Sequence, residues 1–598
     1  VGCLLSLSSL LSPELRLFCS ASALAFLTLA CAPEEDSGST RKAALLPEPN
    51  WQGYELSAGS DRRDVYALGD EEQLLALRRE GTLAMLRDPS PYAGAMIPLS
   101  FWRLVQGSRS AWQRIEGIPG AHRLKEELEA YLPRLQDAVD AGLRRMPRDG
   151  AGKAIVFGFD EALTFDDEGL PIGLAAHAID EGEAKGATGI SLSCAACHSS
   201  NLFGRHVPGL PNKMMNIHPL VDTLLRGRGG ALAFGQGMLG RVNDLLATLR
   251  RRNRGEDAPL LAELRLLQRT LEDLRYVQTL PAQPGLDSAL NAVALSLARR
   301  QDDARATRTP ESLRSPRDNA LSTQRMDSKP PAWFILRYFT RFMHDASFVG
   351  ANPVLVNFVN SHLGLGADIT PLYAWYEREE NKRSLQALTA AIFATPAPRY
   401  QDFITHAPID SAKAERGKGL YAERCAHCHG DYRARSGCEQ AGSGQPPTLF
   451  YPPQPARIDV GSDPSRWQGM RAYAAEAKRV DYLGTRYAIE SAPEPRSTDR
   501  GYRRTPLVSV WSTYPYFHNG SCPNLCCVLA SEGEESSDPR FQRQSYQRFF
   551  AVEPKDPVRD FDSECVGFPA PDTLAAERRL ARYEYRVGEP GLSNAGHD

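Results

Sequence analysis

The sequence predicts a mainly α protein with long irregular stretches and at most short strands. Apolar residues recur at spacings of three and four in several segments, as they do along one face of a helix. In addition, two Cys-x-x-Cys-His motifs begin at residues 194 and 425. Because they lie 231 residues apart, they cannot share one small fold of about 100 residues. We therefore expect a domain around each motif, preceded by a helical region.

The overall charge of the chain is nearly balanced. Its 598 residues include 70 Lys and Arg and 73 Asp and Glu, which gives a net charge of −3. This balance argues against nucleic acid as a partner. With 42% hydrophobic and 24% charged residues, the body of the chain has the composition of a soluble globular protein.

The N-terminus has the pattern of an export signal. Residues 17–30 are apolar or small, follow Arg16, and form a stretch too short for a typical membrane span. Residues 27–31 resemble the bacterial lipoprotein box, in which Cys31 would carry the lipid that anchors the protein to the outer membrane. An ordinary cleaved signal peptide is the alternative. We expect a signal peptide over 1–30, a tether over 31–60, and a location in the periplasm or at the cell surface. The first residue is Val, so the true start of the gene product stays open.

Helices are expected on both sides of the first motif. An N-terminal helical region over 61–160 includes predicted helices at 71–87 and 124–144, and two more amphipathic helices are expected within 219–275. The basic run from Arg250 to Arg254 is interpreted as a solvated helix end. Residues 300–328 have almost no large apolar side chain and are expected to form a linker or surface insertion.

The two motifs are attachment signals for c-type haem. Their thiols add to the two vinyl groups of a haem, and the adjacent His becomes the proximal ligand of the iron. The residues are Cys194, Cys197 and His198 in the first motif, and Cys425, Cys428 and His429 in the second. The alternatives are a redox pair of cysteines, or two pairs that share one zinc ion. A His after both pairs in an exported chain favours two covalently bound haem c groups.

The residues around the second motif are typical of a small cytochrome c domain. The segment 411–424 predicts a helix with Asp410 or Ser411 as its cap and a break at Cys425. The fold class is therefore mainly α, with two cytochrome c-like haem domains, long irregular loops and an N-terminal helical extension. The expected domains cover 161–299 and 406–598, with an inter-haem helical segment over 329–405.

The second axial ligand decides what each haem does, because a six-coordinate iron transfers electrons whereas an open position binds oxygen or peroxide. For the second haem the sequence offers His518 and His597. For the first haem the candidates follow the motif; they are His206, Met214, Met215 and His218.

At these residues the chain resembles the di-haem cytochrome c peroxidase superfamily, and within it most closely the di-haem rubber oxygenase-like c-type cytochromes. The matching blocks keep the order of the family between about residues 170 and 598. The Cys-x-x-Cys-His and His-Asn-Gly-Ser blocks are specific to the superfamily, and the Pro-Pro-x-Trp and terminal Gly-His blocks narrow it to the oxygenase-like branch. The blocks are residues 189–193 before the first motif, 329–333, 363–367, 415–430, 504–525 and 593–597.

The resemblance implies a role for individual residues. His429 would be the proximal and His597 the distal ligand of the second haem, which makes a bis-His electron-transfer centre. His198 would be the proximal ligand of the first haem, whose other side is open and is the reaction site. Trp333 would lie between the haems and shorten the electron path, with plain core packing as its alternative. Phe348 would shape the distal pocket, and His518 would be a structural or haem-propionate neighbour.

Some residues depart from the family. If His218 binds the first iron, that site is closed, or opens only when the other haem is reduced as in the peroxidases. The chain stops one residue after His597, where the family usually continues, so it is expected to be truncated. A calcium ion between the domains, as in the peroxidases, stays open. Five cysteines outside the haem motifs suit disulfides with one thiol left over; they are Cys438, Cys522, Cys526, Cys527 and Cys565.

The predicted function is that of a haem-dependent oxidoreductase, an oxygenase or peroxidase. The first haem activates O2 or H2O2, and the second exchanges electrons with a periplasmic donor or acceptor. The organic substrate is not defined by the sequence. One alternative is a non-catalytic periplasmic electron carrier with both haems six-coordinate, which His218 favours. A further alternative is a surface binding module without haem redox change.

Overall fold

The computed structural model describes residues 44–49, 51, 62–87, 96–106, 118–159, 169–180, 182–215, 231–252, 255–274, 283–286, 325–339, 341–349, 352–364, 370–433, 448–450, 457–477, 490–491, 500–530, 536–569, 583–589 and 591–597. The chain divides into two compact units, Val1–Leu45 and Leu46–Asp598. The expected signal peptide, Cys31 and most of the expected linker lie outside the described residues.

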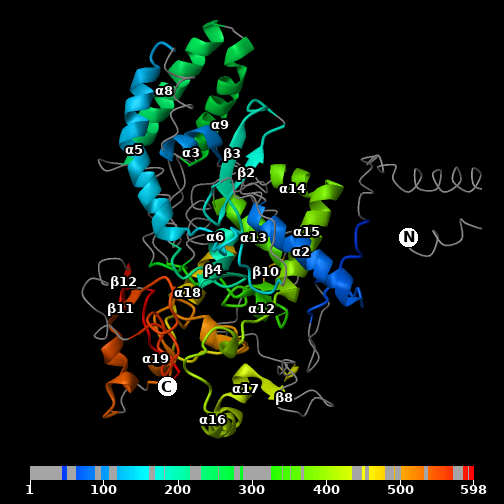
Figure 1. Cartoon of the computed structure of the whole chain (residues 1–598), viewed down its shortest axis with the longest axis vertical. Coiled ribbons are helices and arrows are strands. Elements are labelled where there is room, and N and C mark those ends of the chain that lie inside the picture. The colour runs from blue at the N-terminus through cyan, green and yellow to red at the C-terminus, as the bar shows by residue number, and fades with distance from the viewer. Residues whose placement is uncertain are drawn as a thin grey trace, which may run out of the picture. The chain divides into compact units, whose positions relative to one another are not determined.

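One group of helices packs around a leucine-rich core of its own. The helices are α3 (Leu99–Val105), α5 (Ala121–Gly142), α8 (Ala231–Arg252) and α9 (Ala258–Leu274). Figure 1 shows α5, α8 and α9 side by side, and α8 contacts both of the others. Buried Leu124, Val242 and Leu264 belong to this core. The group confirms the two amphipathic helices expected within 219–275, and α5 begins three residues before the predicted 124–144 helix.

A second group of helices packs around α15 (Glu379–Ala394). Its members are α2 (Glu71–Arg87), α12 (Trp333–Leu336), α13 (Pro353–Gly364), α14 (Thr370–Tyr376) and α15 (Glu379–Ala394). The α2 helix coincides with the prediction and packs along α15. Ten successive residues of α15 are buried, from Leu385 to Ala394. This helix therefore forms the centre of the group, with α2 on one side and α12 on another.

Among the residues that the structure describes, the strands are short and form five small sheets. Two sheets have three strands, in the orders β1-β3-β2 and β10-β7-β6, and the pairs β11-β12, β4-β5 and β8-β9 form the others, all antiparallel. The strands are β1 (Ile97–Pro98), β2 (Leu174–Ala178), β3 (Thr188–Leu192), β4 (Ser199–Leu202), β5 (Arg205–Pro208), β6 (Arg341–Phe342), β7 (Phe348–Val349), β8 (Asp431–Arg433), β9 (Thr448–Phe450), β10 (Glu490–Ser491), β11 (Arg548–Ala551) and β12 (Tyr583–Arg586).

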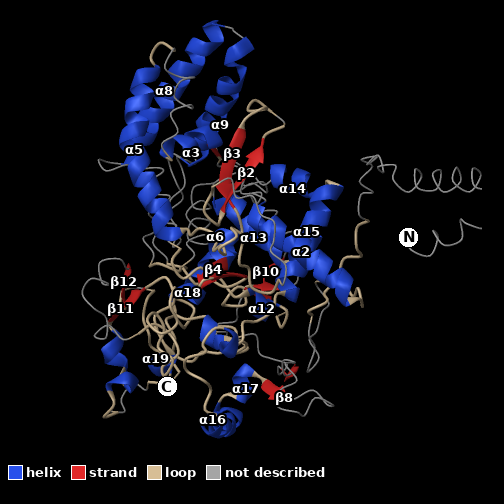
Figure 2. Ribbon diagram, viewed as in Figure 1, coloured by secondary structure: helices blue, strands red, loops and turns tan. Residues whose placement is uncertain are grey.

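The remaining helices belong to the C-terminal half, where loops predominate (Figure 2). They are α16 (Ser411–Arg424), α17 (Ala426–His429), α18 (Ser465–Ala477) and α19 (Leu525–Val528). In the N-terminal half, the short helix α6 (Ala195–His198) carries the first motif. The largest core cluster draws side chains from Met85 to Leu592, so it crosses the domain boundaries expected from the sequence. The division into two haem domains stays a prediction.

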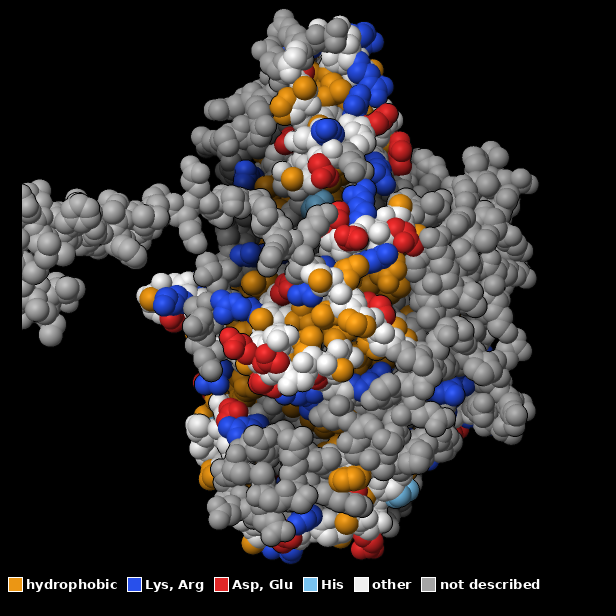
Figure 3. Space-filling view, turned by 90° about the vertical axis from the view of Figure 1, so that its right-hand side faces the viewer, with side chains coloured by type: hydrophobic (Ala, Val, Ile, Leu, Met, Phe, Trp, Pro, Cys, Tyr) orange, Lys and Arg blue, Asp and Glu red, His pale blue; other side chains and the backbone are white. Residues whose placement is uncertain are grey.

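The described surface mixes both signs of charge. On the face drawn in Figure 3, Lys and Arg side chains alternate with Asp and Glu around a central group of hydrophobic side chains. This mixture agrees with the net charge of −3. Within the part of the chain that the structure describes, no helix is both long and apolar enough to cross a membrane.

Candidate haem sites

The first motif lies in a tightly bonded turn between strands. It follows β3, forms α6, and continues into the β4-β5 hairpin. Asn212, which is 6% exposed, holds this turn from the other side. Its backbone N–H donates to the Cys197 carbonyl at 3.0 Å, and its amide Nδ2 donates to the Ala196 carbonyl at 2.8 Å. Ala195 and Ala196 are buried, so the motif is part of the core.

Trp333 packs directly against His198. The two ring centroids are 5.7 Å apart, and the indole is 2% exposed. Gly209 joins their backbones, because its N–H donates to the His198 carbonyl (2.8 Å) and its carbonyl accepts from the Trp333 N–H (2.9 Å). Gly209 has a φ of 77°, and a Cβ there would lie 2.7 Å from the Cβ of Trp333. Only glycine therefore allows this close approach.

The surroundings of His198 favour its neutral form. Burial lowers the pKa of His198 to about 4, and the carbonyl of Pro331 offsets only part of that shift. A neutral imidazole has the free lone pair that a metal ligand needs. The first motif thus presents a neutral His with an aromatic ring beside it.

The structure places the other residues that were predicted at the first haem in several separate elements. His206 is fully buried in β5, where its Nδ1 lies 3.1 Å from the Oδ1 of Asn201, and it lines a small cavity together with Ala195 and Met214. Met215 is buried as well. Phe348 lies in β7, paired with Phe342 of β6 and Ser491 of β10. His218 lies outside the described residues.

The second motif begins at the end of an exposed helix. The Asp410 carboxylate caps α16 by accepting from the N–H groups of Ala412 (2.9 Å) and Lys413 (3.0 Å), as the sequence predicts. No residue of α16 or α17 is buried, and Leu420 is 57% exposed. Gly430 ends α17 with a φ of 88°, and its carbonyl accepts from the Tyr421 hydroxyl at 2.7 Å.

His429 and His597 face each other at the second motif. Nδ1 of His429 lies 2.7 Å from the Thr505 carbonyl, and because a carbonyl only accepts, Nδ1 carries the proton and Nε2 keeps its lone pair. The two imidazole centroids are 6.1 Å apart with an interplanar angle of 12°. Metal–nitrogen bonds of about 2 Å on both sides of an iron put two imidazole centroids about 6 Å apart. The pair therefore has the spacing of two axial ligands.

The segment around His518 supports this pair. The Phe517 ring stacks on His597 with centroids 5.5 Å apart. His518 itself is 8% exposed; its Nε2 lies 3.0 Å from the Tyr502 hydroxyl, and the two rings stack at 4.1 Å. His518 thus contacts Tyr502, and its role as a structural or haem-propionate neighbour stays a prediction.

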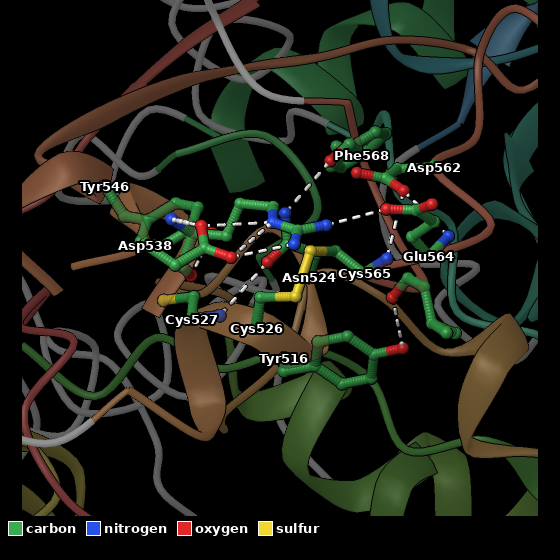
Figure 4. The surroundings of a disulfide bond; sticks show 12 residues. Tyr516, Asn524, Cys526, Cys527, Asp538, Tyr546, Asp562, Glu564, Cys565 and Phe568 are labelled. Carbon is green, nitrogen blue, oxygen red and sulfur yellow. Dashed lines mark hydrogen bonds and ion pairs between the residues drawn. A yellow bond between two sulfur atoms is a disulfide. The ribbon is translucent and has the colours of Figure 1, made fainter. Parts of the chain in front are cut away.

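Two disulfides lie next to this segment. They join Cys522 to Cys527 and Cys526 to Cys565, and they use none of the four motif cysteines. Figure 4 shows Asn524, Cys526 and Cys565 close together, with Tyr516 beside them. Cys438, the fifth cysteine outside the motifs, lies outside the described residues.

These residues fit covalently bound haem c. The motif thiols are not used in the disulfides, and the imidazole of His429 has its Nε2 available. The apolar face of α16 has no protein core against it, and a large apolar group would supply one. Among the described residues, no cluster of three or more His, Cys, Asp and Glu side chains could hold a further metal ion.

Sequence reasoning missed the roles of two lysines that lie between the motifs in the sequence, the buried Lys213 and the partly buried Lys329. Lys213 donates to the carbonyls of Ser512 (2.6 Å) and Tyr514 (2.7 Å), and Lys329 donates to those of Thr513 (2.8 Å) and Pro515. The two Lys side chains thus bind alternate backbone carbonyls of residues 512–515, the segment that precedes Phe517. Burial lowers the pKa of Lys329 to about 7. Lys329 begins the block at 329–333 that carries the family resemblance, and that position was the sequence signal available for it.

Comparison with known proteins relates the second site to a known cytochrome family. Residues 501–536 match the family described as RoxA-like, cytochrome c-like. This span contains Thr505 and Phe517, which contact the two facing imidazoles. The match supports a RoxA-like c-type cytochrome relationship for this part of the chain, and with it covalently bound haem c.

A relative is also found in Sinorhizobium fredii (strain NBRC 101917 / NGR234). The chain is 22% identical over 228 residues to its uncharacterized protein y4iJ, which covers 32% of this chain and 34% of the relative. The match thus spans about a third of each protein.

Proposed function

We propose that the protein is a di-haem c-type cytochrome oxidoreductase in which the two motifs hold haems with different tasks. Cys194, Cys197 and His198 would hold a haem that supplies O2 or H2O2 chemistry, and Cys425, Cys428 and His429 would hold one that supplies electron transfer. The observation that carries the proposal is the contrast between a facing imidazole pair at the second motif and a His paired with an indole at the first. A haem with one open axial position supplies oxygen or peroxide chemistry when bound.

At the first motif, the residues orient the proximal ligand and exclude water. His198 is kept neutral by burial, and Asn212 fixes the turn that carries it. The Trp333 ring packs on His198, and Gly209 joins the backbones of the two residues by hydrogen bonds. We expect this indole to shorten the electron path between the haems, and Phe348 to line the reaction pocket. The organic substrate is not specified by these residues.

At the second motif, His429 and His597 would hold the haem iron from opposite sides. The Thr505 carbonyl holds the tautomer of His429, and Phe517 packs against His597. A partly exposed motif that follows the exposed helix α16 suits exchange of electrons with a soluble donor or acceptor. The two disulfides fit an oxidising compartment such as the periplasm, where the predicted lipid on Cys31 would attach the protein to the outer membrane.

Low-temperature EPR with spin quantification tests the proposal on the full-length holoprotein as isolated in air. One low-spin signal per chain, with the other iron high-spin or held as an oxygen adduct, is the expected result. Two low-spin signals that account for all the iron would instead indicate an electron carrier, or a peroxidase that needs prior reduction. The variant His198→Ala should remove only the signals of the first haem.

A further inference from the structure

The C-terminal segment 591–597 carries His597 as the last residue that the structure describes. His597 is exposed and has a φ of 68°, a left-handed conformation that few residues other than glycine adopt. An imidazole in this position does not orient itself, so something else must hold the segment against the second motif. The contacts that do so come from the His-Asn-Gly-Ser block.

We propose that Asn519 and Ser521 are positioning residues for the second haem, because they hold the segment that presents His597 to the iron. The amide Nδ2 of Asn519 donates to the Gly591 carbonyl at 3.1 Å and to the Ser593 carbonyl at 3.0 Å. The Ser521 hydroxyl donates to the same Ser593 carbonyl at 2.9 Å. Both side chains are fully buried. The inference rests on the proposed role of His597 as an axial ligand.

The residue types suit this task. An amide has two N–H donors on one nitrogen, and Asn519 uses them on two carbonyls that are two residues apart. Its Oδ1 accepts from the Ser521 N–H at 3.2 Å, which fixes the direction of the amide. A carboxylate of the same shape would keep this last bond but would place negative charge against both carbonyls. Asn519→Asp therefore removes the hydrogen bonds to the Gly591 and Ser593 carbonyls with little change in side-chain volume.

Other backbone contacts continue the grip as far as His597. The Asp463 carboxylate accepts from the Ser593 N–H at 2.9 Å, and Arg543 donates to the Gly596 carbonyl at 2.8 Å. The His597 N–H donates to the Val460 carbonyl at 2.9 Å. At Gly596, where φ is 113°, a Cβ would lie 2.7 Å from the Ser462 hydroxyl oxygen. Close contacts thus hold the backbone of the segment along its length, and the imidazole of His597 lies at its end.

Competition with imidazole measures how firmly His597 is held. Added imidazole binds the second iron only when His597 has left it, so the half-saturating imidazole concentration falls as the segment loosens. Each lost hydrogen bond should lower that concentration about fivefold. We expect a decrease of about fivefold for Ser521→Ala and about 25-fold or more for Asn519→Asp, which loses two bonds. Ser521→Thr keeps the hydroxyl and should restore the wild-type value.

Asn524 provides a matched control. It is 1% exposed, it accepts from the Cys527 N–H at 3.1 Å and donates to the Phe568 carbonyl at 3.3 Å, and neither bond reaches the segment 591–597. Figure 4 shows it beside the disulfides. Asn524→Asp should reduce stability and leave the imidazole titration unchanged. An equal shift in Asn524→Asp and Asn519→Asp would overturn the proposal, since general loosening would then explain both.

The variant His597→Ala separates this inference from the proposed function. It should convert the second haem from low-spin to high-spin in EPR and visible spectra. If the low-spin signal persists, His597 is not the ligand and both proposals fail. If the signal is lost, but Asn519→Asp and Ser521→Ala titrate like the wild type, only the positioning role fails. Ser521→Ala removes a single hydroxyl, so it decides the question even if Asn519→Asp does not fold.

Discussion

The two haem motifs have the same five-residue pattern but opposite surroundings. The first packs into the core through its buried Ala195 and Ala196, its carbonyls accept from Asn212 and Gly209, and an indole packs on its His. The second follows a helix with no buried residue, and its His faces an exposed imidazole. On the proposed function, the motif specifies attachment, while the surrounding chain decides whether the iron would be shielded for chemistry or presented for electron exchange.

The largest difference is expected when each pair of thiols is removed. Replacing Cys425 and Cys428 by Ser should halve the haem content and leave the body folded, because that motif lies outside the protein core. The same change at Cys194 and Cys197 should halve the haem content and also lower the melting temperature and soluble yield. Haem staining after denaturing electrophoresis and thermal unfolding check both results. Equal losses of stability would contradict the contrast between the two sites.

Truncating Trp333 tests how much the first site depends on packing. Trp333→Ala should lower the free energy of unfolding by about 3–5 kcal/mol, because the Trp333 side chain is only 2% exposed and its loss leaves a cavity in the core. Leu529→Ala, in the C-terminal half, should change it by less than about 0.5 kcal/mol, since Leu529 is 68% exposed. Denaturant unfolding followed by circular dichroism measures both. A small effect of Trp333→Ala would mean that the indole does not support the core around His198.

The pH dependence of stability probes the connection between the sites through Lys329. Its pKa is lowered by burial to about 7, whereas an unfolded Lys keeps its proton to about pH 10.4. Between these values the unfolded chain binds more protons, so this group makes the free energy of unfolding rise with pH, by at most about 1.4 kcal/mol per pH unit.

Lys329→Met should remove that part of the rise, as measured by denaturant unfolding of the holoprotein across this pH range. The matched control is Lys418→Met, because the Lys418 side chain is 72% exposed in α16. The control should keep the wild-type slope. An unchanged slope in Lys329→Met would show that the Lys329 ammonium is not buried in solution.

The smallest effect is expected at the cap of α16. Asp410→Ala removes the acceptor for the N–H groups of Ala412 and Lys413 and should cost about 1 kcal/mol of local stability. Hydrogen exchange of the α16 amides checks this loss. The EPR signals of the first haem should not change, and a change there would mean that the exposed helix is coupled to the buried motif.

Local signals made parts of the fold predictable from the sequence. The helices at 71–87 and 411–424 occur as predicted, because periodicity and the Asp410 cap act within a few residues. The blocks that carry the resemblance brought His429 and His597 together, although no local signal links residues so far apart. The roles of the Thr505 carbonyl, Lys213 and Lys329 could not be anticipated, because they depend on contacts with distant segments of the chain. His218, whose role decides the state of the first iron, lies outside the described residues.

The two uses of cysteine in this chain impose an order on its biogenesis. Cys194, Cys197, Cys425 and Cys428 must still be thiols when haem is attached, whereas the four disulfide cysteines must become oxidised. All four disulfide cysteines come later in the sequence than both motifs, so on the proposed route of export from the N-terminus the chain would present the haem-binding thiols first. Oxidants that act too early would pair a motif thiol with Cys522 or Cys565 and block attachment. Maturation of this protein therefore depends on the relative rates of haem ligation and disulfide formation during export.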